Sequence, residues 1–293
     1  MRHFIRRRWL VVLLGVLSVL ALGLFARWLN ATKRGGQETA EPFRIAGNVY
    51  YVGANDVAAF LITGREGHVV IDGGYPSTAP MIMGSIAKLG FNIADVKVLL
   101  NSEPHPDHAG GLGVLQQASG AELWASEASA DVIASGGDDS DMALPVRALI
   151  RIGILGYPAT RVDHRFKDGD TIRVGPLALT AHVTGGHTRG CTSWSFPVRD
   201  GDRVLNVVSA CELGPLWGMR YPEQGFDFER SFRVLRSLPA DIWVTCHARR
   251  WGRYRKFVAR ATAKDPADPF IDPEGYRVYI DSAEARFRRD FVH

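Results

Sequence analysis

The sequence is poor in cysteine, with only three in 293 residues. A framework of several disulfides is thereby excluded, and the odd number means that at least one thiol is free or paired with another chain. No internal repeat or low-complexity tract follows the first 45 residues. Hydrophobic residues make up 46% of the chain and charged residues 23%, a balance that excludes disordered, collagen-like and coiled-coil proteins.

Acidic residues are absent from residues 1–34, which hold seven of the 35 Lys and Arg residues. All 31 acidic residues therefore lie in the remainder, which is mildly acidic although the whole chain is net +4. The basic pI near 9.0 belongs to the leader and not to the folded part. We therefore expect no nucleic-acid partner.

The leader has the pattern of a membrane-directed segment. Arg6-Arg7-Arg8 precede an uncharged, mostly apolar run of 18 residues from Trp9 to Ala26. As a helix this run would rise about 27 Å, enough to cross a bilayer. Because basic flanks stay cytoplasmic, we expect residues 1–34 to be an export signal or an uncleaved inner-membrane anchor, with the rest of the chain in the periplasm. Residues 35–45 are predicted to be a linker and residues 46–293 a catalytic domain.

Hydrophobic periodicity predicts an α/β domain. Val96–Leu100 is a continuous apolar run that fits a buried strand. Other strands are predicted at Asn48–Val52, Ala58–Thr63, His68–Ile71, Ala121–Trp124, from Thr171 to Val208, and at Ile242–Thr245. Helices are predicted at Pro80–Gly90, Gly111–Ala118, Glu127–Ala134 and Phe226–Leu238. The order indicates one domain in which two sheets pack together with helices outside.

The richest chemistry follows the buried strand. The loop from Asn101 to Gly111 holds four potential metal ligands within six positions: Glu103, His105, Asp107 and His108. The first three alternate, so an extended segment would project them to one side, and His108 would turn into a helix. Imidazole and carboxylate groups suit zinc, whose catalytic sites hold three protein ligands and one water.

Two further histidines occupy comparable places. His187 lies in a glycine-rich turn between strands, and His247 follows the apolar strand Ile242–Thr245. Together with the loop they supply enough groups for two sets of three ligands. The remaining histidines are interpreted as structural or exposed: His3, His68, His164, His182 and His293.

In these residues the chain resembles the metallo-β-lactamase superfamily, and within it the subclass B3 metallo-β-lactamases. The resemblance covers roughly residues 46–290 and includes the sequences Ile71-Asp72-Gly73-Gly74, His105–Gly111 and Gly186–Trp194. It implies a four-layer αβ/βα sandwich with two zinc ions per chain at one edge, between the sheets.

The resemblance also implies the ligands. Glu103, His105 and His187 would hold the first zinc, and Asp107, His108 and His247 the second. The family pattern begins with His where this chain has Glu103, which makes the first site more negative by one charge and its bound water less acidic. Glutamate still binds zinc at normal distances, so this variant is expected to work.

The cysteines are not expected to bind zinc. In other lactamase subclasses a cysteine near position 211 binds the second metal, but three other residues already fill that site here. Cys211 is therefore expected near the pocket, and Cys191 and Cys246 read as small buried side chains. The turn Val207–Glu212 contains no aspartate, whereas glyoxalase-type thiolesterases and related lactonases of the superfamily place a bridging one there. This favours the lactamase branch.

The resemblance implies hydrolysis of β-lactams (penicillins, cephalosporins and carbapenems) by a metal-bound hydroxide that Asp107 orients. Arg220, Arg249 and Arg250 are available to bind a substrate carboxylate, and Leu213, Trp217 and Tyr157 to line an apolar wall; each has an equally good structural explanation, and no substrate-binding residue is assigned. Two alternatives stay open. One is another hydrolase of this fold, acting on a lactone, thioester or sulfate ester, and the other is a non-catalytic zinc-binding protein of the envelope.

Overall fold

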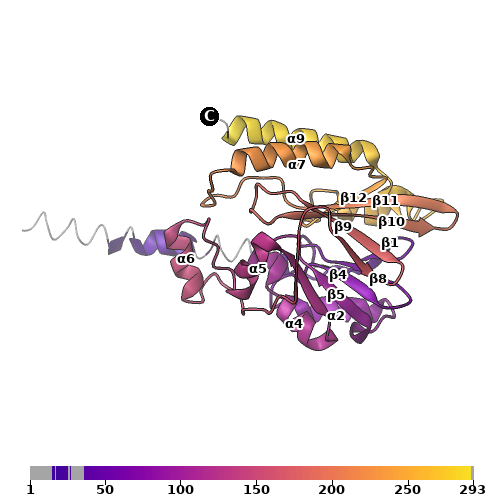
Figure 1. Ribbon diagram of the computed structural model, residues 1–293, viewed down its shortest axis with the longest axis horizontal. Coiled ribbons are helices and arrows are strands. Elements are labelled where there is room, and N and C mark those ends of the chain that lie inside the picture. Colours follow the sequence, from indigo (N-terminus) through magenta and orange to yellow (C-terminus); the bar gives the residue numbers. More distant parts are fainter. Residues whose placement is uncertain (1–14, 17, 26, 28–35, 292–293) are drawn as a thin grey trace, which may run out of the picture.

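Two β-sheets lie face to face, and helices cover the outer surface of each (Figure 1). The computed structural model describes residues 15–16, 18–25, 27 and 36–291. Within them the four layers form the αβ/βα sandwich expected from the sequence, so the predicted fold class is confirmed.

The first sheet contains seven strands that follow one another in chain order. They are β1 (Phe43–Ala46), β2 (Val49–Tyr51), β3 (Phe60–Ile62), β4 (His68–Ile71), β5 (Val96–Leu100), β6 (Glu122–Ser126) and β7 (His164–Phe166). β1 to β4 are antiparallel, and from β4 onward the pairing is parallel. Parallel neighbours need long crossovers, which here contain α2 (Ala79–Lys88), η1 (Ile93–Asp95), α3 (Pro106–Ala109), α4 (Leu112–Ser119), α5 (Glu127–Ala134) and α6 (Leu144–Arg151).

The second sheet has the strand order β12-β11-β10-β9-β8. Its strands are β8 (Thr171–Val174), β9 (Leu177–Val183), β10 (Thr192–Asp200), β11 (Arg203–Ala210) and β12 (Ile242–Thr245). Only the β11–β12 pair is parallel, and α7 (Gln224–Ser237) lies in its crossover. α7 and α9 (Pro273–Phe291) cover the outer face of this sheet (Figure 1). α8 (Arg253–Ala259) and η2 (Asp268–Phe270) connect β12 to α9.

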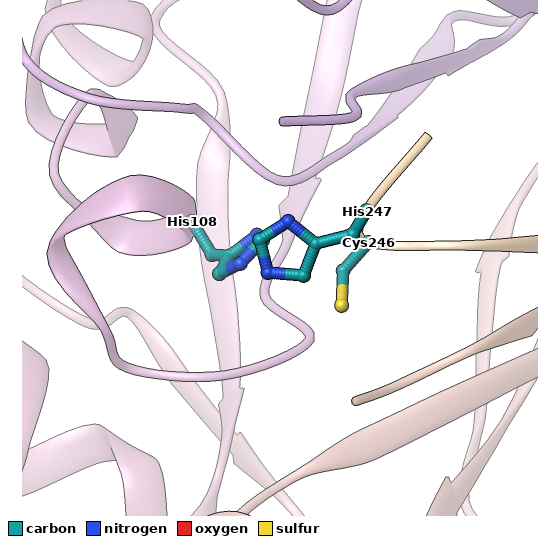
Figure 2. Close-up of side chains that lie close together, drawn as sticks. All are labelled: His108, Cys246 and His247. Atoms are coloured by element: carbon teal, nitrogen blue, oxygen red, sulfur yellow. The ribbon is translucent and has the colours of Figure 1, made fainter. Parts of the chain in front are cut away.

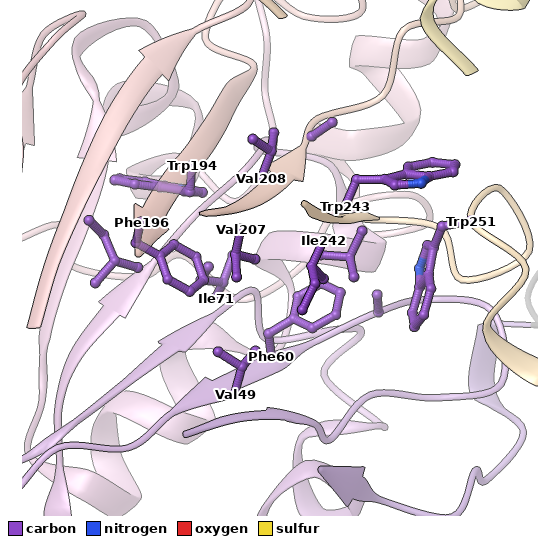
Figure 3. Close-up of a cluster of buried hydrophobic side chains, with 14 of the residues drawn as sticks. Val49, Phe60, Ile71, Trp194, Phe196, Val207, Val208, Ile242, Trp243 and Trp251 are labelled. Carbon is purple, nitrogen blue, oxygen red and sulfur yellow. The ribbon is translucent and has the colours of Figure 1, made fainter. Parts of the chain in front are cut away.

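Alternate side chains of the first sheet enter two different cores. In β3, Phe60 and Ile62 belong to the core between the sheets, whereas Leu61 packs under the helices of the first half. This is the two-residue period of a strand buried on both faces. Large rings fill the inner core, among them Trp194 and Trp251 (Figure 3), and each fully buried large apolar side chain contributes roughly 1.5–3 kcal/mol.

A buried carboxylate joins the two halves at the far end of β10. Asp200 accepts hydrogen bonds from the backbone N–H of Gly47 at 2.9 Å and from Arg203 at 2.7 Å. Burial raises the pKa of Asp200, but these donors and the Arg44 guanidinium hold it below its usual value. The ionised carboxylate therefore fastens the β1–β2 turn to the second sheet.

The predicted bounds of several helices and strands agree with the structure, whereas other elements begin elsewhere or were not predicted. Val96–Leu100, Glu127–Ala134 and Ile242–Thr245 have the predicted bounds. β1 already begins at Phe43, within the stretch predicted as linker, and α6, none of whose residues is buried, was not predicted. The leader expected over residues 9–26 lies largely outside the described residues, among which no helix is long and apolar enough to cross a bilayer.

Candidate metal centre

The candidate ligands lie at one edge of the sandwich, where strands of both sheets end. Glu103–His108 follow β5 of the first sheet, whereas His187 and His247 follow β9 and β12 of the second. The backbone N–H of Thr192 donates to the Ser102 carbonyl at 2.7 Å and joins two of these loops. The site is therefore assembled from both halves of the molecule.

The first cluster consists of Glu103, His105 and His187, the residues that the resemblance assigned to the first zinc. One ligand atom from each lies within 4.8 Å of the other two. Glu103 Oε2 is 2.7 Å from His105 Nδ1 and 3.2 Å from His187 Nε2. The structure thus brings together the three groups predicted for this site.

The second cluster contains the other three predicted ligands, Asp107, His108 and His247. Asp107 Oδ2 is 3.3 Å from His108 Nε2 and 3.9 Å from His247 Nε2. The two imidazole rings lie 5.1 Å apart and nearly perpendicular, and Figure 2 shows them side by side with Cys246. The thiol of Cys246, interpreted from the sequence only as a small buried group, also lies within 4.8 Å of a ring nitrogen of each histidine.

The loop before the helix is shorter than expected. α3 begins directly after His105, so Asp107 lies in the first helical turn beside His108 and not on an extended segment with Glu103. Pro106 explains this start, because proline at the first helical position has the required φ and lacks an N–H that would otherwise be unpaired. The expectation that three alternating residues share one extended face was wrong.

The candidate ligands differ in how deeply their side chains are buried. The side chains of Glu103 and His108 are each 1% exposed and form the floor of the site. Asp107 is 22% exposed and lies toward solvent, with the remaining histidines between these limits. Asp107 is therefore the more exposed of the two carboxylates among the candidate ligands.

Glu103 faces both clusters. Its Oε1 lies 3.3 Å from His108 Nε2, whereas its Oε2 faces His105 and His187. Burial raises the pKa of Glu103, but His187, His108 and His105 together hold it well below its usual range. Burial likewise lowers the pKa of His187, yet the Glu103 carboxylate outweighs it and raises that pKa to about 9. The Glu103 carboxylate and the imidazoles of His108 and His187 therefore favour each other's charged forms.

Several buried ring nitrogens have no hydrogen-bond partner within the described part of the chain. They are His105 Nε2, both ring nitrogens of His108, and His247 Nδ1. Unpaired buried polar atoms are rare in native proteins and indicate a missing partner. Nitrogen, carboxylate and sulfur donors at these positions suit a metal such as zinc, so the residues present fit the group that the resemblance implies.

Two carboxylates outside the ligand clusters lie beside the histidine rings, and neither was predicted from the sequence. Asp72 Oδ2 lies 3.5 Å from His108 Nδ1, and Asp56 Oδ2 lies 3.6 Å from His247 Nδ1. Such partners fix the ring orientation and basicity of metal-bound histidines. Asp72 accepts a 2.8 Å hydrogen bond from the Ser102 N–H and has a φ of 64°, a left-handed conformation that aspartate tolerates.

A buried ion pair shapes the loop behind His187. His187 Nδ1 is hydrogen-bonded to the Gly214 carbonyl. Glu212 accepts from the Gly214 N–H at 2.9 Å and lies 3.2 Å from the Arg250 guanidinium. The Arg250 charge, considered from the sequence as a substrate contact, therefore has a structural partner.

Two of the three cysteines are joined, which the sequence did not predict. Cys191 and Cys211 form a disulfide, so Cys191 is not an isolated small side chain and Cys246 is the free thiol. The two residues stand at the open end of the β10–β11 hairpin, whose register pairs Trp194 with Ser209. The cross-link thus joins the ends of the His187 and Glu212 loops.

The apolar candidates for a substrate wall separate into two kinds. Leu213 belongs to the core between the sheets, and the hydroxyl of Tyr157, itself buried under the first-half helices, donates to the Pro104 carbonyl at 2.7 Å. Trp217, in contrast, is 86% exposed in the loop that continues from Gly214. Of these three candidates, Trp217 is the one whose side chain is exposed.

The other charged and histidine candidates have local partners. Arg249 pairs with Asp56 at 3.1 Å, and the Arg220 guanidinium lies 4.8 Å from the Phe291 ring centre. The histidines interpreted as structural have contacts away from the site: His68 with Gly64, His164 with Glu122, and His182 with Ser195. His3 and His293 lie outside the described residues.

Comparison with known proteins gives one family. The model of the family "Metallo-beta-lactamase superfamily" matches residues 52–201. The solved structure of Rm3 metallo-beta-lactamase is 37% identical, with a TM-score of 0.80 over 87% of this chain and 95% of that one. BJP-1, a subclass B3 metallo-beta-lactamase of Bradyrhizobium japonicum, is 31% identical, with a TM-score of 0.78 over 89% and 97%.

Curated relatives carry a different activity. The hydroxyacylglutathione hydrolase of Rhodopseudomonas palustris is 25% identical over 195 residues, which are 66% of this chain and 62% of that protein. The enzyme of the same name from a Jannaschia species is 29% identical over 48% of this chain and 44% of its own length. The match thus spans 62% and 44% of these two curated relatives but nearly the whole of the solved lactamases.

Proposed function

Since the chain belongs to the metallo-beta-lactamase superfamily and is a hydrolase of that fold, we propose that it hydrolyses β-lactams with two zinc ions. The observation that carries the proposal is the meeting of six ligands from both sheets in two clusters. The similarity to solved β-lactamases over nearly their whole length supports the same substrate class.

The protein groups have distinct tasks in this reaction. Zinc, when bound, would supply a Lewis acid and lower the pKa of a water molecule. Glu103, His105 and His187 would hold one ion, and Asp107, His108 and His247 the other. Asp107, the most exposed carboxylate side chain of the site, would accept a hydrogen bond from the attacking water and orient it. Trp217, which is 86% exposed in the loop that continues from Gly214, would offer an apolar surface to the substrate.

A second candidate is thioester hydrolysis, which the curated hydroxyacylglutathione hydrolases favour. The turn after β11 argues against it. In that turn the only carboxylate is Glu212, and its oxygens face Arg250 and the N–H groups of Leu213 and Gly214. No aspartate is present there to bridge two metals.

The two functions separate in one assay series with the purified full chain. A penicillin, a cephalosporin, a carbapenem and a hydroxyacylglutathione thioester would each be supplied to zinc-loaded protein and to protein stripped by a chelator. We expect β-lactam turnover that chelation abolishes and zinc restores. Asp107→Asn should lose this turnover, whereas Asp131→Asn, a surface change on α5 paired with Arg165, should retain it. Thioester turnover without β-lactam turnover would overturn the proposal.

A further inference from the structure

We infer that Cys246 is a ligand of the second metal ion, which is then held by a thiolate together with Asp107, His108 and His247. The inference deepens the proposed function, because it rests on the same metal centre. It concerns a residue that lies beside the expected ligands and has no other role in the reaction as described above.

The position of the sulfur carries the inference. Cys246 Sγ and one ring nitrogen each of His108 and His247 lie within 4.8 Å of one another (Figure 2). The sulfur is also 3.6 Å from Glu103 Oε1, the oxygen that lies 3.3 Å from His108 Nε2. Cys246 therefore stands on the floor of the site, on the side of the second cluster.

An independent observation indicates that a ligand is missing at this point. His108 is 1% exposed, and neither of its ring nitrogens has a hydrogen-bond partner among the described residues. Nδ1 faces the Asp72 carboxylate at 3.5 Å, whereas Nε2 faces Glu103 and Asp107, which are themselves candidate ligands. A buried polar atom without a hydrogen-bond partner is destabilising, and a metal ion between His108 Nε2 and Cys246 Sγ would supply the partner that Nε2 lacks.

The backbone explains how two consecutive residues supply ligands to one site. In a regular strand Cys246 and His247 would point to opposite faces. Here β12 ends at Thr245, and the Thr245 hydroxyl donates to the His247 carbonyl at 2.8 Å, which turns the chain. The Ala58 N–H donates to the Cys246 carbonyl at 2.9 Å and holds this turn against the first sheet.

Chemistry favours Cys246 over the other cysteines. Cys191 and Cys211 are joined in a disulfide and offer no thiol, whereas Cys246 is free and buried. On binding, the Cys246 S–H bond breaks, its proton passes to solvent, and a sulfur–metal bond forms. A soft thiolate would favour zinc over harder cations such as magnesium or manganese.

Four protein ligands would make the second site closed, whereas the first site, with three, keeps an open position. We therefore expect the first equivalent of metal to occupy the second site. The open position for water and substrate would then be on the metal of the first site, and Asp107 of the second site would still orient that water. Two three-ligand sites of similar affinity would show no such preferred order of filling.

The test uses the full chain, stripped of metal, with its disulfide intact and no reductant present. Cobalt(II) replaces zinc, because a thiolate ligand gives an intense sulfur-to-cobalt charge-transfer band in the near ultraviolet that nitrogen and oxygen ligands do not give. We expect this band to develop with the first equivalent of cobalt. It should disappear in Cys246→Ser and persist in the matched control Cys191→Ser/Cys211→Ser.

A second measurement does not depend on any variant. X-ray absorption of the wild-type protein loaded with one equivalent of zinc should contain a zinc–sulfur shell at about 2.3 Å beside nitrogen and oxygen at about 2.0–2.1 Å. Cobalt or zinc bound without a sulfur signal, or a band that survives Cys246→Ser, would overturn the inference and leave the metal centre standing. Absence of metal binding altogether would overturn both the inference and the proposed function.

Discussion

Loss of the Cys191–Cys211 disulfide should destabilise the protein markedly. The cross-link spans a sequence separation of 20 residues and closes the β10–β11 hairpin at its open end. Replacing both cysteines by serine removes the covalent constraint from the unfolded chain, while the hairpin register still holds the two positions close in the folded one. The main effect therefore falls on the unfolded state.

The size of the effect follows from the loop length. A closed loop of about 20 residues restricts the unfolded chain by roughly 11 cal/mol/K, which is about 3.3 kcal/mol at 25 °C. For a domain of this size a change of 1 kcal/mol shifts Tm by about 2–4 °C. We therefore expect Cys191→Ser/Cys211→Ser to lower the free energy of unfolding by about 3 kcal/mol and Tm by roughly 7–13 °C.

Urea denaturation of metal-free protein measures this difference without a contribution from bound ions. A reductant should lower the stability of the wild-type protein to that of the double variant and leave the double variant unchanged. Cys246→Ser, which keeps the disulfide, should remain sensitive to the reductant. A double variant that unfolds at the wild-type urea concentration would refute the reasoning, because the cross-link would then not constrain the unfolded chain.

Three further perturbations address the site and the junction between the halves. Asp72→Asn should weaken metal binding at the second site about 10–100-fold, since His108 loses the carboxylate beside its Nδ1, and competition with a chromophoric chelator would measure it. Glu103→His should gain no activity, measured as kcat/KM, because the carboxylate already contacts ligands of both clusters; a sharp rise would instead indicate a site degraded by the glutamate. The ionised Asp200 carboxylate has a lowered pKa, so its contribution is fully present above about pH 4 and is lost as the pH falls through the folded-state pKa. Urea titrations should accordingly find Asp200→Asn less stable than the wild-type protein at pH 7, with the difference shrinking in acid; a constant difference would contradict this.

Local pattern was enough to predict the strands that are apolar over most of their length. Val96–Leu100, apolar except at Lys97, and the mainly apolar Ile242–Thr245 leave little choice of structure. α6 has a marked apolar side, but none of its residues is buried, and this short amphipathic segment was not recognised as a helix from the sequence. The start of α3 was missed because Pro106 was read as part of a loop and not as the first helical residue.

The six candidate ligands could be picked out because they lie in recognisable sequence contexts, and the structure brings the six groups together. The disulfide and the outer carboxylates were not, because they depend on which segments meet in space. Cys191 and Cys211 become neighbours only through the hairpin, and Asp72 meets His108 only because β4 and β5 are paired. Cys246 did offer a signal, as a thiol directly beside an expected ligand.

The division of the ligands between two sheets determines when the pocket can form. Glu103 and Cys246 are 143 residues apart, so the floor of the site exists only after both halves have folded and docked. All the candidate ligands of the site can therefore bind one metal centre only in the docked state. A bound ion stabilises only the docked state, by about 2.7 kcal/mol when its free concentration is a hundred times Kd. It therefore slows the separation of the halves without speeding their formation. The supply of metal would consequently set the lifetime of the folded chain as well as its turnover.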